Sequence, residues 1–457
     1  MTQCNTDTML FSKILPQNSR SKSVQADFDG GQITSDAGAL LLREVDEHIG
    51  LIDAISSCIP DPRSPIMTIH KQRDMIAQRA IALALGYEDL NDHGTLRDDP
   101  LMQVATNRGV DADQPLASTP TMWRLEDRVD RKAMARIIDV FVEQFIASHE
   151  SPPSHITLDF DPTDTKIHGH QAQRHYHGYY GHYCYLPLYV FCGDQLLVPY
   201  LRPCNIDGAK HSRAILKLLV RRFRRQWPEV RIIFRADSGF CRWKLMRWCD
   251  NNGVGYIIGL RKNPVLNRLA EVLTIPAEIN YKRTGDDQRL FCSMSYGAES
   301  WDRERRVILK AEHNHKGGNH RFVVTNLPGD AQELYDDLYC QRGDMENRIK
   351  EQQLGLFADR NSSKDFLANQ FRMIMSSAAY ILMETLRRTG LKNTELENAQ
   401  ASTIRTKLLK IGGRVIVSAR RVVVHMSSGF PLQNVFSRIL AQLQSISHPA
   451  KPALAET

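Results

Sequence analysis

Residues Arg231–Phe240 read RIIFRADSGF. The apolar start of this stretch is typical of a strand buried in a sheet, and it leads directly into Asp237, then into Ser238-Gly239 and a helix. Open α/β sheets present functional groups at such positions, where a strand ends and a helix begins. The stretch therefore predicts a strand of an α/β sheet with a functional Asp237 at its carboxyl end. In the alternative interpretation, Asp237 only caps the following helix.

The segments around this stretch complete a sheet. Three strands precede it, one helix separates it from them, and a helix and one more strand follow it. This order predicts an α/β fold with a mixed five-stranded sheet and flanking helices. The predicted strands lie at 155–162, 183–191, 195–203, 230–237 and 254–260, and the predicted helices lie at 213–227 and 244–253.

The rest of the chain differs from this core. Residues 1–150 predict mainly helices, including one of about eight turns that starts at Thr119-Pro120. The stretch SPPS at 151–154 predicts a domain boundary near residue 152. Residues 289–329 alternate apolar and polar side chains between glycines, and they predict β hairpins inserted into the core. Helices return after residue 330.

Composition favours a cytosolic protein. The chain has 457 residues, of which 42% are hydrophobic and 24% charged, as in ordinary soluble proteins. The best candidate for a membrane span, residues 185–201, is interrupted by Gly193-Asp194. Its apolar runs are therefore shorter than the roughly 18 residues that a span needs. Residues 1–22 lack the apolar core of a signal peptide. Nine cysteines without a Cys-x-x-Cys pair are typical of reduced thiols in a reducing compartment.

Basic residues concentrate in two stretches, although the net charge is only +7. For either stretch alone, a solvated face and a nucleic-acid surface are equally good interpretations. Two such stretches in one chain favour nucleic acid. The first holds Lys217, Arg221, Arg222, Arg224 and Arg225, and the second holds Arg405, Lys407, Lys410, Arg414, Arg420 and Arg421.

A second acidic site lies in ITLDFDPTDT, residues 156–165. The two-residue period of a strand places Asp159 and Asp161 on one face at its carboxyl end. Carboxylates placed there cost stability unless a cation meets them. The alternative is a turn, because Asp-Pro-Thr-Asp is also good turn chemistry.

A third acid, Glu346, lies in YCQRGDMENRIKEQQ, residues 339–353. At about 100° per residue, a helix places it one turn from Arg342 and from Lys350. The alternative is a solvated face with i,i+4 ion pairs. The residues expected on this face are Tyr339, Arg342, Glu346, Lys350 and Gln353.

Acids from two strands and a later helix supply what phosphodiester chemistry needs. Two hard divalent cations about 3.5 to 4 Å apart, held by carboxylates, activate the attacking oxygen and stabilise the leaving one. Neighbouring Arg and Lys side chains would bind the phosphates.

Residues 167–185, IHGHQAQRHYHGYYGHYCY, suggest zinc as a further hypothesis, because histidine is the commonest metal ligand. The segment contains no His-x3-His or Cys-x2-Cys pair, so we expect it to contact DNA or to border the core. It follows the first acid directly and would line the rim of the site. Within it, His168 could approach a scissile phosphate, and a structural histidine is the alternative.

With these motifs the chain resembles the DDE transposases of bacterial insertion sequences, and among them it is most similar to the insertion sequence 1380 family. The resemblance extends from about residue 28 to residue 445 and implies a ribonuclease H-like core with a β insertion before the last acid. The stretches that carry it are LDFDPTDTKIHGHQ (158–171), FRADSGF (234–240), YCQRGDMENRIKE (339–351) and TIRTKLLKIGGRVIVSARRVVVHMSSGFP (403–431).

The resemblance also implies the site residues. The first catalytic acid matches Asp161, within Asp-Pro-Thr, with Asp159 as the substitute, and the second matches Asp237. The third matches Glu346, within the family's Tyr-x2-Arg-x3-Glu-x6-Lys signature, in which Tyr339 and Arg342 also match. The sequence departs from this signature at its last position, where Gln353 replaces the lysine. Lys350, on the same predicted face, is the candidate replacement.

By this resemblance the chain is a transposase that binds the terminal inverted repeats of its element and cuts and joins DNA strands. The three acids would hold two Mg²⁺ ions, with Mn²⁺ as a possible substitute. Tyr339, Arg342 and Lys350 would position the DNA. A homodimer or higher assembly on paired ends, a bacterial cytoplasmic location at the nucleoid and no membrane partner are also implied.

Two alternatives and a domain division complete these expectations. The chain could be an inactive or co-opted transposase that only binds DNA, or a ribonuclease H-like nuclease that recognises DNA shape. The expected domains are an N-terminal helical, DNA-end-binding domain at 1–152, the first part of the catalytic core at 153–263, the inserted β subdomain at 264–330, the final core helices at 331–395 and a basic C-terminal segment at 396–457.

Overall fold

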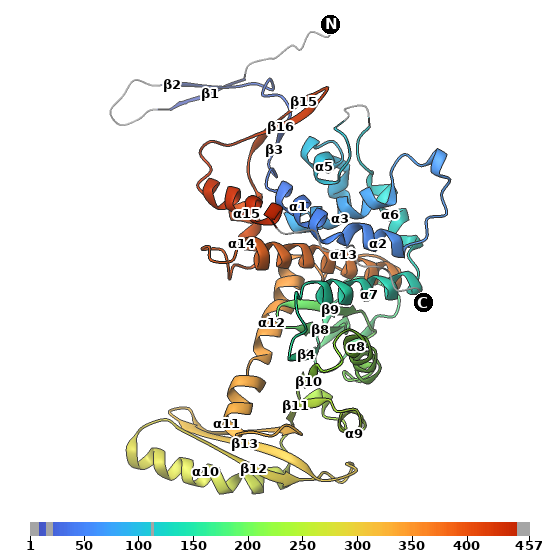
Figure 1. The fold of residues 1–457 in the computed structure, drawn as a ribbon. Helices are drawn as coiled ribbons and strands as arrows, with labels where there is room; N and C mark the ends of the chain where they lie inside the picture. The colour runs from blue at the N-terminus through green and yellow to red at the C-terminus, as the bar shows by residue number, and fades with distance from the viewer. Residues whose placement is uncertain (1–8, 15–21, 111–113, 446–457) are drawn as a thin grey trace.

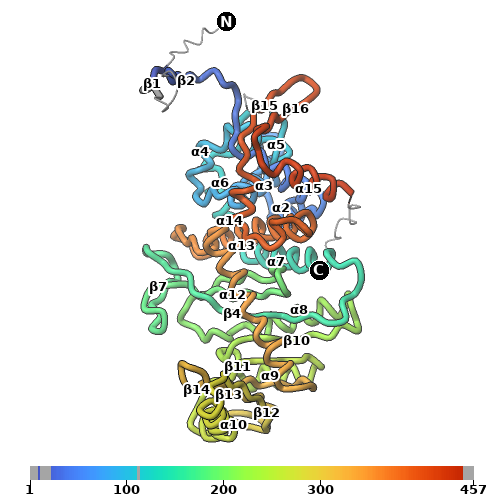
Figure 2. The backbone as a smooth tube through the Cα atoms, turned by 90° about the vertical axis from the view of Figure 1, so that its left-hand side faces the viewer, coloured from blue at the N-terminus to red at the C-terminus, as the bar shows by residue number. Residues whose placement is uncertain are grey.

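The computed structural model describes residues 9–14, 22–110 and 114–445. The molecule is elongated: a helical body lies at one end, a mixed sheet fills the middle, and a β extension covered by a long helix forms the other end (Figure 1). The tube in Figure 2 shows the same three levels from the side. No helix within these residues is long and apolar enough to cross a membrane.

An eight-stranded mixed sheet has the order β12-β13-β14-β11-β10-β4-β8-β9. The neighbours β4, β10 and β11 are parallel, and the other pairs are antiparallel. The strands are β4 (His155–Pro162), β8 (Leu188–Cys192), β9 (Gln195–Tyr200), β10 (Arg231–Ala236), β11 (Gly255–Leu260), β12 (Gln288–Tyr296), β13 (Arg305–Asn314) and β14 (Gly317–Thr325).

The strands predicted at 155–162, 195–203, 230–237 and 254–260 are present in the sheet, but the one predicted at 183–191 is divided into β7 (His182–Tyr185) of a smaller sheet and β8 of this one, and the predicted count of five is wrong. Strands β12 to β14, expected as inserted hairpins, join the same sheet because β14 pairs antiparallel with β11, from Ile257 opposite Thr325 to Leu260 opposite Phe322. Without this pairing, the outer edge of β11 would present a row of unsatisfied N–H and C=O groups. The β extension, which consists of β12, β13 and β14, is therefore continuous with the core.

Helices cover both faces of the sheet. One face packs against α7 (Arg131–Ala147), α8 (Ser212–Gln226), α9 (Trp243–Asn251) and, over the β extension, α10 (Pro264–Thr284). On the other face, α11 (Ala331–Glu333), the π-helical segment Leu334–Tyr339 and α12 (Arg342–Lys350) run from the β extension toward the helical body (Figure 1).

The helical body draws on both ends of the chain. Its central helix, α13 (Phe366–Thr385), is buried along almost its whole length and packs against α3 (Gln72–Leu85) in one hydrophobic core. The other helices are α1 (Ala39–Ile49), α2 (Leu51–Cys58), α4 (His93–Leu96), α5 (Pro100–Ala105), α6 (Thr119–Arg128), α14 (Ala401–Ile404) and α15 (Gln433–Ser445). Short 3-10 turns lie at Pro65–Met67, Leu90–Asp92 and Ser238–Phe240, and further π-helical segments at Glu351–Gly355, Leu386–Gly390 and Arg405–Leu409.

The long helix predicted from Thr119 is wrong, because the segment forms two helices, α6 and α7. Val129 between them is extended. Asp130 then caps α7 by accepting a hydrogen bond from the N–H of Ala133 at 2.7 Å. The N–H groups in the first turn of a helix have no partner within the helix, and a capping side chain accepts a hydrogen bond from one of them. Such a cap can start a new helix inside an otherwise continuous apolar pattern.

Three smaller sheets complete the fold. The histidine-rich segment forms a sheet of order β5-β7-β6, and the C-terminal basic hairpin pairs with an N-terminal strand in the order β16-β15-β3. Their strands are β1 (Met9–Ile14) and β2 (Lys22–Ala26), which pair with each other, β3 (Ile33–Thr34), β5 (Thr165–Lys166), β6 (His175–His177), β7 (His182–Tyr185), β15 (Gly413–Ser418) and β16 (Arg421–Met426).

Candidate active site

The parallel strands β4 and β10 bring two predicted acids to one edge of the sheet. Their register sets Phe160 beside Ala236, so Asp161 and Asp237 follow at the same level. Asp237 accepts a hydrogen bond from the N–H of Gly239 at 2.8 Å and thereby caps a 3-10 turn. Capping does not exclude a further role, because this bond uses one of the two carboxylate oxygens.

Asp159 is engaged elsewhere in the core. Its carboxylate accepts two hydrogen bonds from Arg235, at 2.5 and 2.7 Å, and the residue is 2% exposed. Arg235 also donates to the carbonyl of Leu338 at 2.5 Å, which links the sheet to the helical segment before α12. By contrast, the side chain of Asp161 is 16% exposed and contacts Arg342.

Helix α12 brings Glu346 to the same edge of the sheet. The guanidinium of Arg342 lies 2.6 Å from the carboxylate of Glu346 and 3.5 Å from that of Asp161. Arg342 therefore joins an acid on a strand to an acid on a helix. We call Asp161, Asp237, Glu346, Arg342 and Tyr339 the acidic cluster.

Electrostatics within the acidic cluster centre on Asp161. Its pKa is raised to about 7, mainly by burial and also by the charges of Asp237 and Glu346, while the charge of Arg342 lowers it. Burial alone would lower the pKa of Arg342, but Asp161 and Glu346 raise it. The acidic cluster thus contains one guanidinium and three carboxyl groups, and this excess of acidic groups attracts a further cation.

Tyr339 enters the cluster above a glycine of β11. A Cβ atom at Gly259 would lie 2.6 Å from the Tyr339 hydroxyl and 2.9 Å from the backbone nitrogen of Ser238. Burial raises the pKa of Tyr339, Arg342 lowers it and Asp237 raises it. Since no side chain fits at position 259, the glycine lets the tyrosine and the segment after β10 approach each other.

The face expected from Tyr339 to Gln353 is interrupted at both ends. Tyr339 ends one π-helical segment, and Gln353 lies in another, Glu351–Gly355, so a constant 100° per residue does not apply across α12. Lys350 is exposed at the end of α12. Gln353 donates from Nε2 to the carbonyl of Asp164 at 3.3 Å and so contacts the loop that follows Asp161.

The histidine-rich segment lies beside the cluster. Burial raises the pKa of Tyr180 to about 12, with smaller contributions from the charges of Asp164 and Asp161. His182 contacts the carboxylate of Asp164 at 2.7 Å. Further along, Arg174 contacts the ring nitrogen of His170 at 2.8 Å. The small sheet thus borders the acidic cluster on the side of β4.

The carboxylates supply the oxygen ligands that Mg²⁺ and Mn²⁺ prefer. In the part of the chain that the structure describes, no three His, Cys, Asp or Glu side chains come close enough to hold one ion. The guanidinium of Arg342 contacts both Asp161 and Glu346. The donor set fits a divalent cation in its chemistry.

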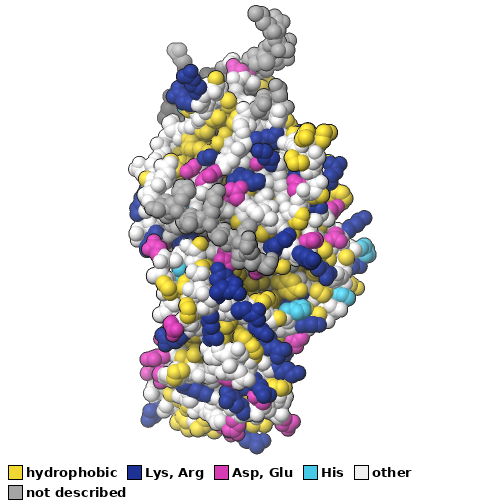
Figure 3. Space-filling model, turned by 45° about the vertical axis from the view of Figure 1, so that its right-hand side comes forward, with side chains coloured by type: hydrophobic (Ala, Val, Ile, Leu, Met, Phe, Trp, Pro, Cys, Tyr) yellow, Lys and Arg dark blue, Asp and Glu magenta, His cyan; other side chains and the backbone are white. Residues whose placement is uncertain are grey.

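Some basic side chains of the two stretches form ion pairs and hydrogen bonds within the chain. Arg222 pairs with Glu143, Arg405 donates to the backbone carbonyls of Ala84 and Gly355, and Lys410 pairs with Asp36. Lys and Arg side chains gather in a band along one side of the molecule (Figure 3). The exposed basic residues of the two stretches are Lys217, Arg221, Arg225, Lys407, Arg414, Arg420 and Arg421.

Two residues that shape the cluster were missed in the sequence. Arg235 lies two residues before Asp237 and therefore on the same face of its strand, a signal that could have been used. Gly259 carries no comparable signal, because its importance depends on Tyr339, 80 residues later (339 − 259).

Comparison with known proteins identifies one matching family. The family described as transposase DDE domain, group 1, matches residues 16–448. No curated protein matches the chain. Among solved structures, the chain is similar to a piggyBac transposase seen by cryo-EM in a synaptic complex with hairpin DNA, at 14% sequence identity over 82% of this chain and 80% of that chain, with a TM-score of 0.43.

Proposed function

The chain belongs to the family of transposase DDE domains, group 1, and from this premise we propose that it is the transposase of a bacterial insertion sequence, of the insertion sequence 1380 type. Its substrates are the terminal inverted repeats of its own element and a target duplex. The observation that carries this proposal is that Arg342 contacts both Asp161 and Glu346 at the carboxyl edge of the sheet, where Asp237 follows the neighbouring strand.

The proposed core is ribonuclease H-like. Within the sheet, β4, β8 and β9 are antiparallel neighbours, and β10 and β11 add in parallel on the other side of β4. This order supports the proposal, since it places the carboxyl ends of β4 and β10 next to each other. The third acid then comes from a helix after the β extension, as the resemblance implies.

We assign Asp161 as the first acid rather than Asp159, because Asp159 already holds Arg235 with both carboxylate oxygens. Asp161, Asp237 and Glu346 would hold Mg²⁺ or Mn²⁺. When bound, the ions would lower the pKa of the attacking water and stabilise the charge on the leaving oxygen. Asp161 has to lose its proton to serve as a ligand, and Arg342 helps because its positive charge lowers that pKa.

Arg342 and Tyr339 of the cluster, together with Lys350 and the histidine-rich segment, position the DNA. Arg342 can turn from the carboxylates to a phosphate, to which a guanidinium donates two parallel hydrogen bonds. Tyr339 presents a hydroxyl at the same place, and the exposed Lys350 extends the positive charge along α12. The histidine-rich segment forms the rim along which the cut strand runs.

The domain division expected from the sequence is retained as part of the proposal. The helical domain at 1–152 and the exposed basic residues bind the element ends, and two or more copies act on paired ends. The protein works at the nucleoid in the bacterial cytoplasm.

A cleavage and joining assay on a labelled duplex that carries the flanking element end tests the proposal. With Mg²⁺, the wild type should nick at the end and join it to a second duplex. Asp161→Asn, Asp237→Asn and Glu346→Gln should bind the duplex without cutting it. Asp344→Asn is the matched control, because Asp344 is an exposed acid of the same helix, and it should remain active.

Other outcomes of the assay identify the alternatives. A wild type that binds the element end but does not cut it is an inactive or co-opted transposase. A wild type that cuts by DNA shape and never joins strands is a nuclease.

A further inference from the structure

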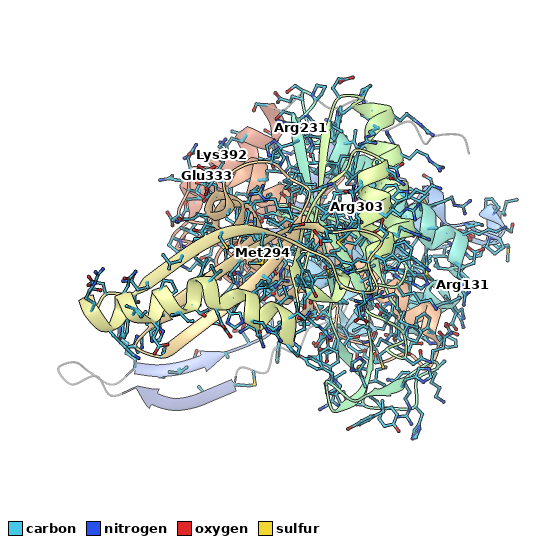
Figure 4. All side chains as sticks on the ribbon, turned by 90° about the horizontal axis from the view of Figure 1, so that it is seen from below. Arg131, Arg231, Met294, Arg303, Glu333 and Lys392 are labelled. Atoms are coloured by element: carbon cyan, nitrogen blue, oxygen red, sulfur yellow. The ribbon has the colours of Figure 1, made fainter. Side chains whose placement is uncertain are left out.

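Helix α12 carries Glu346 and runs beside the sheet, from the β extension to the helical body (Figure 1). Seen from below, Glu333 at the start of this run and Lys392 in the helical body lie on the same side of the molecule (Figure 4). Of the nine residues of α12, only Met345 and Ile349 are buried. Packing of an apolar face normally holds a helix in place, and two side chains bury little apolar surface. Polar contacts therefore have a large share in fixing the position of α12.

Arg348 makes one such contact, with the sheet. Its Nε and Nη2 donate to the two carboxylate oxygens of Asp194, at 2.7 and 3.0 Å. Asp194 lies in the turn between β8 and β9, and β8 pairs with β4 so that Tyr189 lies opposite Asp161. A pair of parallel hydrogen bonds fixes the orientation of its partners as well as their distance. Arg348 therefore connects the helix of Glu346 to the hairpin that borders the strand of Asp161.

The guanidinium of Arg348 is also held from the helical body. Its Nη1 donates at 3.0 Å to Glu351, whose side chain is 2% exposed. Arg387 and the N–H of Ala401, both in the body, donate to the same carboxylate at 2.8 and 2.6 Å. In addition, the hydroxyl of Tyr380 donates to the carbonyl in the turn between β8 and β9 at 2.7 Å. The turn, α12 and the body are thus joined around one side chain.

Arg348 lies on the face of α12 that is turned away from the acidic cluster. At about 100° per residue, it stands about 200° from Glu346, whereas Arg342 stands about 40° from Glu346. The two arginines therefore hold α12 from opposite sides, Arg342 through the acids and Arg348 through the turn. Because Arg348 is directed away from the acids, it would act through the position of Glu346, and not as a metal ligand or a phosphate contact.

We propose that Arg348 is a positioning residue for the third acid, because it fixes the helix that sets Glu346 relative to Asp161. This inference rests on the proposed function, in which the two acids take part in holding a metal ion. Groups that orient metal ligands typically cost about 10- to 100-fold in metal affinity or activity when they are removed. Loss of Arg348 should therefore weaken metal binding, although Arg348 itself does not touch the metal.

Hydrogen exchange of the full chain, followed by mass spectrometry without metal or DNA, tests whether Arg348 holds α12. Arg348→Met and Asp194→Asn should each speed exchange of the α12 amides by about tenfold, because each removes charged hydrogen bonds that hold the helix. The side chain of Asp194 is 46% exposed in a turn, so Asp194→Asn should fold even if Arg348→Met does not.

Arg372→Met is the matched control. Arg372 pairs at 2.8 Å with Glu126, whose side chain is 3% exposed, within the helical body. Its removal leaves a buried carboxylate without its partner, so this variant should lose stability. Exchange of the α12 amides should nevertheless remain at the wild-type rate, because the contact lies outside α12.

Titration with Mn²⁺ tests whether the position of α12 matters to the acids. Binding is followed without DNA, by the electron paramagnetic resonance signal of free Mn²⁺. Arg348→Met and Asp194→Asn should bind Mn²⁺ about tenfold or more weakly, and their DNA cleavage rate should approach that of the wild type when Mn²⁺ is saturating. Arg348→Lys keeps the charge without the planar fork and should recover only part of the affinity. Arg372→Met should bind Mn²⁺ like the wild type.

Two results would overturn the inference. One is exchange of α12 that neither Arg348→Met nor Asp194→Asn changes. The other is an Mn²⁺ affinity that falls as much in Arg372→Met as in these two variants, which indicates a general loss of stability. The proposed function fails on a different result, a wild type that binds Mn²⁺ but never cuts the element end. A selective loss of Mn²⁺ affinity in Arg348→Met would still support the positioning role in that case.

Discussion

Asp159 and Arg235 lie opposite each other on parallel strands and form a buried ion pair with hydrogen bonds of 2.5 and 2.7 Å. An ion pair inside a core is costly to break, because removing one partner leaves the other charge without compensation. Asp159 therefore helps to hold β4 and β10 in register, and we expect it to support the site without binding a metal ion.

We expect Asp159→Asn to lower the free energy of unfolding by about 3 to 5 kcal/mol, because Arg235 then remains buried without its partner. Urea denaturation followed by circular dichroism measures this loss. The double variant Asp159→Leu/Arg235→Met removes both charges and should be closer to the wild type in stability than either single variant. If Asp159→Asn is fully stable but cannot cut DNA, Asp159 and not Asp161 is the first acid.

The raised pKa of Asp161 predicts how stability depends on pH. Its pKa is about 7 in the folded chain against 3.8 for an ordinary aspartate, so between these values the unfolded chain has released a proton that the folded chain retains. Stability from this group is therefore complete at low pH and falls as pH rises to about 7, by at most about 1.4 kcal/mol per pH unit. In EDTA, Asp161→Asn should be more stable than the wild type at pH 8 and similar at pH 4.

The difference between the two proteins isolates Asp161, since other acids titrate in the same window. Burial raises the pKa of Asp46 to about 6, but it does so in both proteins. Thermal melts from pH 4 to pH 8 provide the measurement. Added Mn²⁺ should stabilise the wild type more at pH 8 than at pH 6, because a cation binds the ionised carboxylate. A difference that does not change with pH would contradict the prediction.

The strands that carry the acids could be predicted from the sequence because each is short, apolar and bounded by turns. The five core strands were expected, and so were Asp161 and Asp237 at strand ends, since both features depend on local pattern. Contacts between residues distant in sequence could not be predicted in this way. Arg235 on β10 pairs with Asp159 on β4, and β14, which follows the long helix α10 in the chain, pairs with β11 and extends the sheet.

The helical errors have a different, local origin. Asp130 caps α7 by bonding the N–H of Ala133, three residues later, and so divides an apolar pattern that looked continuous across Val129 and Asp130. The π-helical segments on both sides of α12 changed the direction of Tyr339 and Gln353, and the sequence contains no local signal for such segments.

Gly259 gives a prediction about shape rather than charge. In Gly259→Ala, the added methyl would overlap the Tyr339 hydroxyl and the Ser238 backbone, so we expect a loss of about 1 to 3 kcal/mol in stability and weaker DNA cleavage. Adding Tyr339→Phe removes the closest contact and should restore part of the stability. Gly343→Ala is the control: it meets nothing within 4 Å, and it should be neutral or slightly stabilising. Equal effects of the two alanine variants would exclude a special role for Gly259.

The departure from the family signature at Gln353 leads to a test of Lys350. If Lys350 supplies the missing charge, it contacts a phosphate, and Lys350→Ala should weaken binding of the element end at every sequence. The slope of log affinity against log salt should become shallower by about one, because one fewer counterion is released. Fluorescence anisotropy at several NaCl concentrations measures the slope. Lys316→Ala is the control, since Lys316 is an exposed lysine between β13 and β14, outside the family signature.

Substitution of Gln353 by lysine tests whether Lys350 replaces the lysine that the family signature has at position 353. Gln353→Lys keeps a donor for the carbonyl of Asp164, so the chain should fold normally. In Lys350→Ala/Gln353→Lys, the lysine returns to the last position of the signature, and the wild-type salt slope and cleavage rate should return with it. Gln353→Ala loses only a hydrogen bond and should leave the slope unchanged. If Lys350→Ala does not alter the slope, or the double variant does not restore it, Lys350 does not replace the signature lysine, and the phosphate contact must come from another residue such as Arg342.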